Sequence, residues 1–137
     1  MKQVKLVGEK EFEFKEVSVP EVDPDQVLIR VKACGVCGSD IHSYKGKHPF
    51  VDPPIVLGHE YLGIVEKKGS EVSSEIELGD LVTSELALNC GECYNCQHGR
   101  PELCKEARHL GNVGKDGAMQ EYFTMRSDKV HVLPDDA

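Results

Sequence analysis

Four cysteines crowd into the short segment "CGECYNCQHGRPELC", residues 90–104, with the spacing C-x2-C-x2-C-x7-C. They are Cys90, Cys93, Cys96 and Cys104. Thiolates at x2 spacing can reach one ion from a tight turn, and tetrahedral zinc takes four such donors at about 2.3 Å. Gly91 and Gly99 allow the backbone geometry that such a turn needs. The segment is therefore predicted to be a closed structural zinc site with no position left for substrate.

Two other interpretations of these cysteines are open from their spacing. Disulfides are disfavoured because cysteines two residues apart pair poorly without strain, and because a reducing compartment is expected for this chain. An iron–sulfur cluster is a second alternative, since cysteine spacing alone does not distinguish it from zinc. With all four positions of a zinc ion filled by cysteines, the loop is structural, and the chemistry is expected elsewhere.

A second group of potential ligands lies in "ACGVCGSDIH" and "LGHEY". Taken singly, Cys34 and Cys37 could be a redox pair or buried small residues, and His59 and Glu60 could be ordinary polar residues of a turn. Taken together, Cys37, His59 and Glu60 supply one soft sulfur, one imidazole and one carboxylate. Such a set makes an open zinc site with room for water or substrate.

Ser39 and His42 follow the candidate ligand Cys37 on a predicted short helix. Residues three apart on a helix face the same way, so this hydroxyl and this imidazole are expected to lie side by side. A hydroxyl next to an imidazole can pass a proton out to solvent. The pair is thus a candidate proton relay.

The bulk composition limits the class of protein. The chain has 137 residues, 39% of them hydrophobic, and a formal net charge of −8. This length fits one domain with its own core. An acidic surface argues against nucleic acid or an anionic membrane as the main partner. No apolar run approaches the ~18 residues of a membrane span, and the N-terminus has no signal-peptide pattern, so a cytoplasmic location is expected.

The elements that position these residues are predicted to be mainly strands. Residues 11–17 and 27–33 alternate with the period of 2 that is typical of half-buried strands. Further short strands are expected at 61–69, 79–88, 118–125 and 128–134, and one brief helix at 39–46 with Ser39 as its N-cap and Gly46 after its last turn. Residues 88–117 have no usable periodicity and form a long excursion. This pattern predicts a closed or nearly closed β-barrel.

Four segments carry a resemblance to a known family: "ACGVCGSDIH", "PPIVLGHEYLGIVEKKGSEV", "LGDLVTSELALNCGECYNCQHGRPELC" and "GAMQEYFTM". In this order they resemble the GroES-like catalytic domain of the zinc-dependent medium-chain alcohol dehydrogenases. The similarity is greatest to the branch with polyol (sorbitol), butanediol and threonine dehydrogenases. It implies that residues 1–137 form a mainly β, partly open GroES-like barrel with a short helix and a zinc-stapled loop.

The resemblance also implies roles for individual residues. Cys37 and His59 would bind a catalytic zinc, with Glu60 as third ligand or a close alternate. Ser39 would take the proton of the substrate hydroxyl, and His42 would continue the relay. The structural zinc would be held by Cys90, Cys93, Cys96 and Cys104. Cys34 matches a position that is not a ligand and is expected to be a buried thiol. The implied reaction is oxidation of a secondary alcohol or polyol to a ketone by zinc-assisted hydride transfer to NAD or NADP.

The resemblance covers only part of a family member. Members are more than twice this length and carry a Rossmann domain for NAD(P), whereas no G-x-G-x-x-G occurs in these 137 residues. The glycines of "GNVGKDG", residues 111–117, have the wrong spacing. We therefore expect an excised or truncated catalytic domain that binds zinc but is inactive alone. The full-length protein is expected to be a homo-oligomer that takes a small alcohol or polyol.

Two competing functions follow from the same residues. One is a non-catalytic GroES-like interaction module with a zinc-stapled loop; the second ligand group and the candidate relay argue against it, because a scaffold needs neither. The other is a zinc-ribbon nucleic-acid binder, which the net charge of −8 disfavours.

Overall fold

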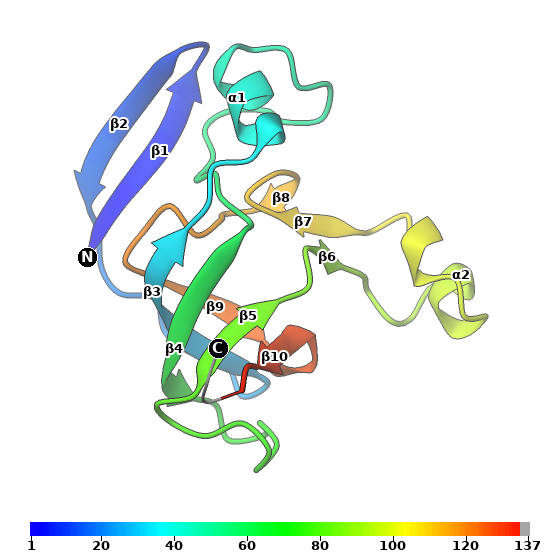
Figure 1. Ribbon diagram of the computed structural model, residues 1–137. Helices are drawn as coiled ribbons and strands as arrows, with labels where there is room; N and C mark the ends of the chain where they lie inside the picture. Colours follow the sequence, from blue (N-terminus) through cyan, green and yellow to red (C-terminus); the bar gives the residue numbers. More distant parts are fainter. Residues whose placement is uncertain (135–137) are drawn as a thin grey trace.

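The computed structural model describes residues 1–134 and confirms a mainly β fold, with open sheets and two short α-helices in this range (Figure 1). The largest sheet has five strands in the order β10–β5–β4–β3–β9. Its strands are β3 (Gln26–Cys34), β4 (Tyr61–Lys68), β5 (Leu81–Ser84), β9 (Tyr122–Arg126) and β10 (Val130–Val132). All their pairings are antiparallel. A 3-10 turn, η2 (Ser127–Lys129), joins β9 to β10.

The main core is built around β3, which pairs with both β4 and β9. Val27, Leu28 and Ile29 are all buried, so the start of this strand is covered on both faces rather than one. Val27 and Ile29 pack in one cluster with residues of β4, β5 and β9. Tyr61 meets Phe123 there, edge to face, with 4.9 Å between ring centroids. Each fully buried aliphatic side chain of this kind contributes about 1.5–3 kcal/mol.

A hairpin of β1 (Lys2–Gly8) and β2 (Glu11–Glu16) stands beside the main sheet. β1 is anchored by Leu6, which is fully buried and bridges to Ile55. The predicted strand at 11–17 exists, but its predicted half-buried face is wrong, because β2 is exposed along its whole length and Phe14 is 80% exposed. β2 pairs only with β1 in the described chain, so no second neighbour covers it.

Helix α1 (Gly38–Tyr44) confirms the predicted helix, but it starts earlier than expected. The N-cap is Cys37, not Ser39, and the Asp40 side chain accepts the backbone N–H of Cys37 at 2.8 Å. An acidic residue that reaches back to the first free N–H stabilises a helix start. Gly46 follows the helix with φ +64°, as expected for a C-terminal glycine.

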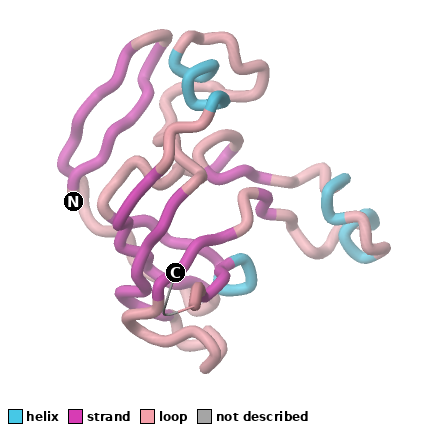
Figure 2. Tube along the Cα trace, in the orientation of Figure 1, coloured by secondary structure: helices cyan, strands magenta, loops and turns pink. Residues whose placement is uncertain are grey.

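The excursion predicted at 88–117 has short elements of its own. The predicted strand at 79–88 is split into β5 and β6 (Ala87–Leu88), and α2 (Tyr94–Gln97) and η1 (Pro101–Leu103) follow. The chain returns through β7 (Arg108–Leu110) and β8 (Gly114–Lys115), which form a small sheet with β6. Figure 2 shows the α2 segment projecting from the body of the protein, to which two loop segments connect it. We call residues 89–107 the cysteine lobe.

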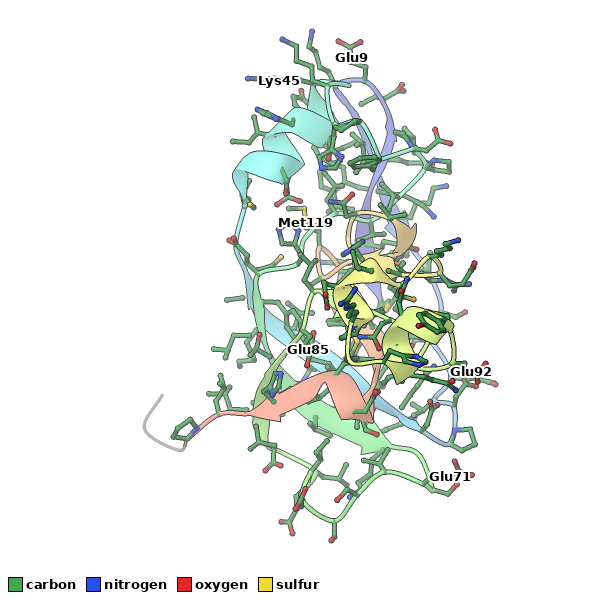
Figure 3. All side chains as sticks on the ribbon, turned by 90° about the vertical axis from the view of Figure 1, so that its right-hand side faces the viewer. Glu9, Lys45, Glu71, Glu85, Glu92 and Met119 are labelled. Atoms are coloured by element: carbon green, nitrogen blue, oxygen red, sulfur yellow. The ribbon has the colours of Figure 1, made fainter. Side chains whose placement is uncertain are left out.

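No helix in the described residues is long and apolar enough to cross a membrane. Seen from the side, the molecule is elongated, with Lys45 near one end, Glu71 near the other and Met119 between them (Figure 3). Met119 packs against the small apolar cluster of Leu6, Ile55 and Leu57.

Close backbone contact at Gly117 generates a testable prediction. A Cβ at Gly117 would overlap the carbonyl oxygens of Gly58 and Leu57, whereas a Cβ at Gly38 would meet nothing within 4 Å. Overpacking of this kind costs about 1–3 kcal/mol. Gly117→Ala is therefore expected to lower the free energy of unfolding by about this amount in urea titrations, and Gly38→Ala is the control without a clash. Equal stability of the two variants would contradict the packing described.

Candidate metal centres

The four sulfurs of the cysteine lobe converge on one point. Their Sγ atoms all lie within 4.8 Å of one another, and all four cysteines are free. The Sγ–Sγ distances are 3.5 Å for Cys93–Cys96 and Cys90–Cys104, and 3.9 Å for Cys90–Cys96. Zinc bound to four sulfurs at about 2.3 Å in a tetrahedron separates them by roughly 3.8 Å. The donor set therefore fits a closed zinc site, and the distances exclude disulfides.

The backbone of the lobe is arranged to favour thiolates. The N–H of Cys93 donates to Cys90 Sγ at 3.4 Å, and this bond lowers the pKa of the Cys90 thiol. The N–H of Cys96 likewise lowers the pKa of Cys93 to about 6. Desolvation and the hydrogen bonds of Cys96 with the neighbouring cysteines raise the pKa of Cys96 to about 12. A divalent cation between the sulfurs would favour the thiolate form of the coordinating cysteines.

The positive φ angles of Gly91 (+76°) and Gly99 (+71°) make the two turns of the lobe. Residues other than glycine rarely adopt this backbone conformation. Between these turns Cys93 caps helix α2, which brings Cys96 back toward Cys93. The lobe thus holds its sulfurs by local backbone geometry.

The second predicted ligand group is also brought together. The ligand atoms of Cys37, His59 and Glu60 lie within 4.8 Å of one another. Cys37 caps α1, while His59 and Glu60 follow Gly58, whose φ of +95° turns the chain into β4. The His59 side chain is 11% exposed, and Glu60 is exposed. One sulfur, one imidazole and one carboxylate suit a zinc site with an open position.

Asp40 is a site residue that the sequence analysis did not single out. Its carboxylate is 4% exposed and accepts the N–H of Cys37 at 2.8 Å and of Gly58 at 3.3 Å. Asp40 Oδ1 also lies 3.8 Å from His59 Nδ1, a buried atom that has no hydrogen-bond partner in residues 1–134. A carboxylate beside one imidazole nitrogen orients the ring and makes the other nitrogen a better metal ligand. An imidazole with a buried carboxylate beside its Nδ1 therefore fits a metal site in which the other ring nitrogen is the ligand.

The predicted relay residues lie on α1, immediately after Cys37. Ser39 is half-buried and His42 is exposed, so the two run from the ligand group toward solvent. The backbone carbonyl of Ser39 accepts a hydrogen bond from Ser43 Oγ at 2.8 Å, which ties this turn of the helix to the next. The positions of Ser39 and His42 do not test the proton relay, which stays a prediction.

Cys34 lies outside both ligand groups. It is half-buried rather than fully buried, and burial, with added effects of Asp40 and Glu60, raises the pKa of its thiol to about 11. A thiol with a raised pKa is a poor nucleophile, which argues against a redox pair with Cys37. Its Sγ packs close to the backbone of Gly58.

The alcohol dehydrogenase GroES-like domain family matches residues 23–135. The chain belongs to this family. Sorbitol dehydrogenase of Bacillus subtilis (strain 168) is 38% identical over 138 residues, which cover 98% of this chain and 39% of that protein. D-arabitol-phosphate dehydrogenase of Enterococcus avium is 40% identical over 129 residues, which cover 93% of this chain and 36% of that protein.

Solved structures agree with this membership. An alcohol dehydrogenase (rspB) from Escherichia coli CFT073, complexed with the cofactor NADH, superposes with a TM-score of 0.89 at 31% identity. The match covers 99% of this chain and 39% of that one. The chain thus spans less than two fifths of these relatives, and the predicted family resemblance and GroES-like fold are confirmed.

Removing one sulfur tests the cysteine lobe. Cys93→Ser is expected to lower the zinc content of the purified chain by one ion and its Tm by more than about 5 °C, because metal binding contributes directly to folding. Inductively coupled plasma mass spectrometry and calorimetry measure both quantities. Cys34→Ser, which changes a thiol outside the ligand groups, should keep the wild-type zinc content. An unchanged zinc content in Cys93→Ser would refute the lobe as a zinc site.

Neutralising Asp40 tests the second group. Asp40→Asn is expected to weaken zinc binding at the Cys37–His59 site by about 10–100-fold, as other partners of metal-bound histidines do, and to leave the lobe unaffected. Competition with a chromophoric chelator measures the two affinities separately. The matched control is Asp116→Asn, since Asp116 also accepts a backbone N–H, that of Val56 at 2.9 Å, but is not the carboxylate beside His59. Equal affinities in both variants would contradict the role of Asp40.

Proposed function

We propose that residues 1–137 are the zinc-carrying catalytic domain of an NAD(P)-linked alcohol or polyol dehydrogenase. The enzyme would oxidise a secondary alcohol or polyol to a ketone by zinc-assisted hydride transfer. The observation that carries the proposal is the convergence of Cys37, His59 and Glu60 beside the start of α1. The names of the relatives, a sorbitol and a D-arabitol-phosphate dehydrogenase, support a polyol-type substrate.

In this proposal the two donor groups have different tasks. Cys37 and His59 would hold the catalytic zinc, with Glu60 as third ligand or a close alternate. Four thiolates, those of Cys90, Cys93, Cys96 and Cys104, would hold the structural zinc. When bound at the first group, zinc supplies Lewis-acid chemistry that makes a hydroxyl group more acidic.

The protein's own residues would position the substrate and move its proton. The Ser39 hydroxyl, in the first turn of α1, would accept the proton of the substrate hydroxyl, and the exposed His42 ring would release it to solvent. Asp40 would keep the His59 ring oriented throughout, since its carboxylate is fixed by two backbone N–H groups. A well-placed proton acceptor of this kind contributes about 10²–10⁴-fold to a rate.

The nicotinamide would be bound by a part of the enzyme outside these residues. Dinucleotides bind at a glycine-rich turn that joins a strand of a parallel sheet to a helix. No G-x-G-x-x-G occurs in the 137 residues, and the five-stranded sheet described here is antiparallel throughout. The 137-residue chain alone would then bind zinc without turning over alcohol. In the whole enzyme we propose a cytoplasmic homo-oligomer with a small alcohol or polyol as substrate, and neither nucleic acid nor membrane as partner.

Cobalt substitution tests the open site without requiring activity. In the Co²⁺-loaded chain, added sorbitol is expected to shift the visible absorption bands of the metal at the Cys37 site, because a substrate hydroxyl can reach a vacant position. Cys37→Ser is expected to lose this shift, whereas Cys93→Ser should keep it. If sorbitol, xylitol and 2,3-butanediol all leave the wild-type bands unchanged, the catalytic reading is wrong and a non-catalytic module is favoured.

The same 137-residue chain, loaded with zinc in place of cobalt, is expected to form no NADH at steady state from NAD and these alcohols. Steady NADH formation by the purified 137-residue chain would contradict the proposed division between this domain and the cofactor-binding part. That result would leave the alcohol chemistry intact, so the two tests separate the two parts of the proposal.

A further inference from the structure

A polar cleft of about 330 Å³ lies between the small sheet and the ends of β3 and β9. Its walls come from five segments: the start of β3, the stretch from β6 into the cysteine lobe, the end of that lobe with the start of β7, the end of β8, and the end of β9. The residues that matter here are Gln26, Asn89, Glu106, Arg108, Lys115 and Arg126. Three of these six side chains are cations, and one is an acid. This positively charged cleft borders the cysteine lobe at Cys90 and includes none of Cys37, His59 and Glu60.

The strand register places two of the cations on one face of the small sheet. Arg108 is the partner of Leu88 across β6 and β7, and Lys115 is the partner of Leu110 across β7 and β8. Cross-strand partners share a face, and so do residues two apart along a strand. Arg108 and Lys115 therefore lie on the same face of the small sheet as Leu110, which is fully buried in the main core.

Arg126 forms a fixed wall of the cleft. It makes two hydrogen bonds to Asp128, Nε to Oδ1 at 3.0 Å and Nη2 to Oδ2 at 2.7 Å. Its Nη1 donates to the backbone carbonyl of Asn89 at 3.0 Å, which ties β9 to the start of the cysteine lobe. The charge of Arg126 is thus already compensated by Asp128. Arg126 therefore shapes the cleft but adds little attraction for an anion.

Arg108 and Lys115 are not compensated in this way. Within residues 1–134, neither has a carboxylate oxygen within 4.0 Å of its side-chain nitrogens. Burial lowers the pKa of Lys115, and the nearby Arg108 lowers it further, while Asp116 and Asp23 act in the opposite direction. A partly buried cation without a partner is costly, and an anion in the cleft would offset that cost.

We propose that this cleft binds a small oxyanion, the phosphate group of a free or esterified phosphate, through Lys115 and Arg108. The volume is at the small end of ligand pockets and suits a phosphate with a short organic group. A guanidinium and an ammonium together are a common pair for phosphate, one as a planar fork and the other as a point charge. The single acid, Glu106, leaves the cleft with a net positive lining. This site is independent of the proposed alcohol chemistry.

Phosphate titration of the zinc-loaded, ¹⁵N-labelled chain tests the proposal by NMR, at constant ionic strength set with chloride. We expect saturable shifts of the backbone amides of Asn89, Arg108, Lys115 and Arg126. Lys115→Met should weaken binding at least tenfold, and Lys115→Arg should retain it. Lys45→Met, which removes the same charge from the exposed end of α1, is the matched control and should bind as wild type.

Titration with glycerol 3-phosphate distinguishes the two sources of the phosphate group. Tighter binding than inorganic phosphate indicates a phosphorylated metabolite, and equal or weaker binding indicates the free anion. Arg108→Gln, at an exposed position, provides the loss-of-binding test if Lys115→Met does not fold. Shifts that do not saturate, that persist in both variants, or that centre on Cys37 and His59 would overturn the proposal.

Discussion

The buried carboxylate of Asp40 is the interaction on which the candidate active site depends. A buried carboxylate is costly unless its oxygens are hydrogen-bonded. Asp40 meets this need with the N–H groups of Cys37 and Gly58, which belong to two segments about twenty residues apart. The contacts that satisfy the charge therefore also bring the Cys37 sulfur and the His59 imidazole together. The Asp40 side chain thus both caps helix α1 and positions the potential ligands Cys37 and His59.

Backbone packing around Gly58 supports the same arrangement from the other side. The carbonyl of Gly58 accepts the N–H of Ala118 at 2.8 Å, and Gly111 and Gly117 lie against its backbone so closely that a side chain at either would overlap it. The barrel strands β3 and β4 hold the two ends of this region, through Cys34 opposite Tyr61. The turn that carries His59 and Glu60 is thus fixed by backbone hydrogen bonds and by glycines that let the backbone segments approach closely.

The sequence predicted which potential ligands converge, because metal ligation depends on residue type and, in the cysteine lobe, on short spacing. The cysteine lobe needs only its own turns, and β3 and β4 follow from local alternation. Two features depend on distant parts of the fold and were not predictable in this way. Phe14 is exposed because β2 has no second neighbour among the described residues, and Asp40 meets Gly58 only after folding. The cationic cleft likewise requires the register of β7 and β8. The start of the helix at Cys37 has a local cause, the Asp40 side chain that accepts the Cys37 N–H.

Anomalous X-ray diffraction at the zinc edge, on crystals of the zinc-loaded chain, tests the central claim most directly. The account predicts two peaks per chain. One should lie among the four sulfurs of the cysteine lobe, and the other about 2.0–2.3 Å from both the Cys37 sulfur and an imidazole nitrogen of His59. A single peak confined to the lobe, with Cys37 and His59 separated beyond bonding distance of any ion, would contradict it.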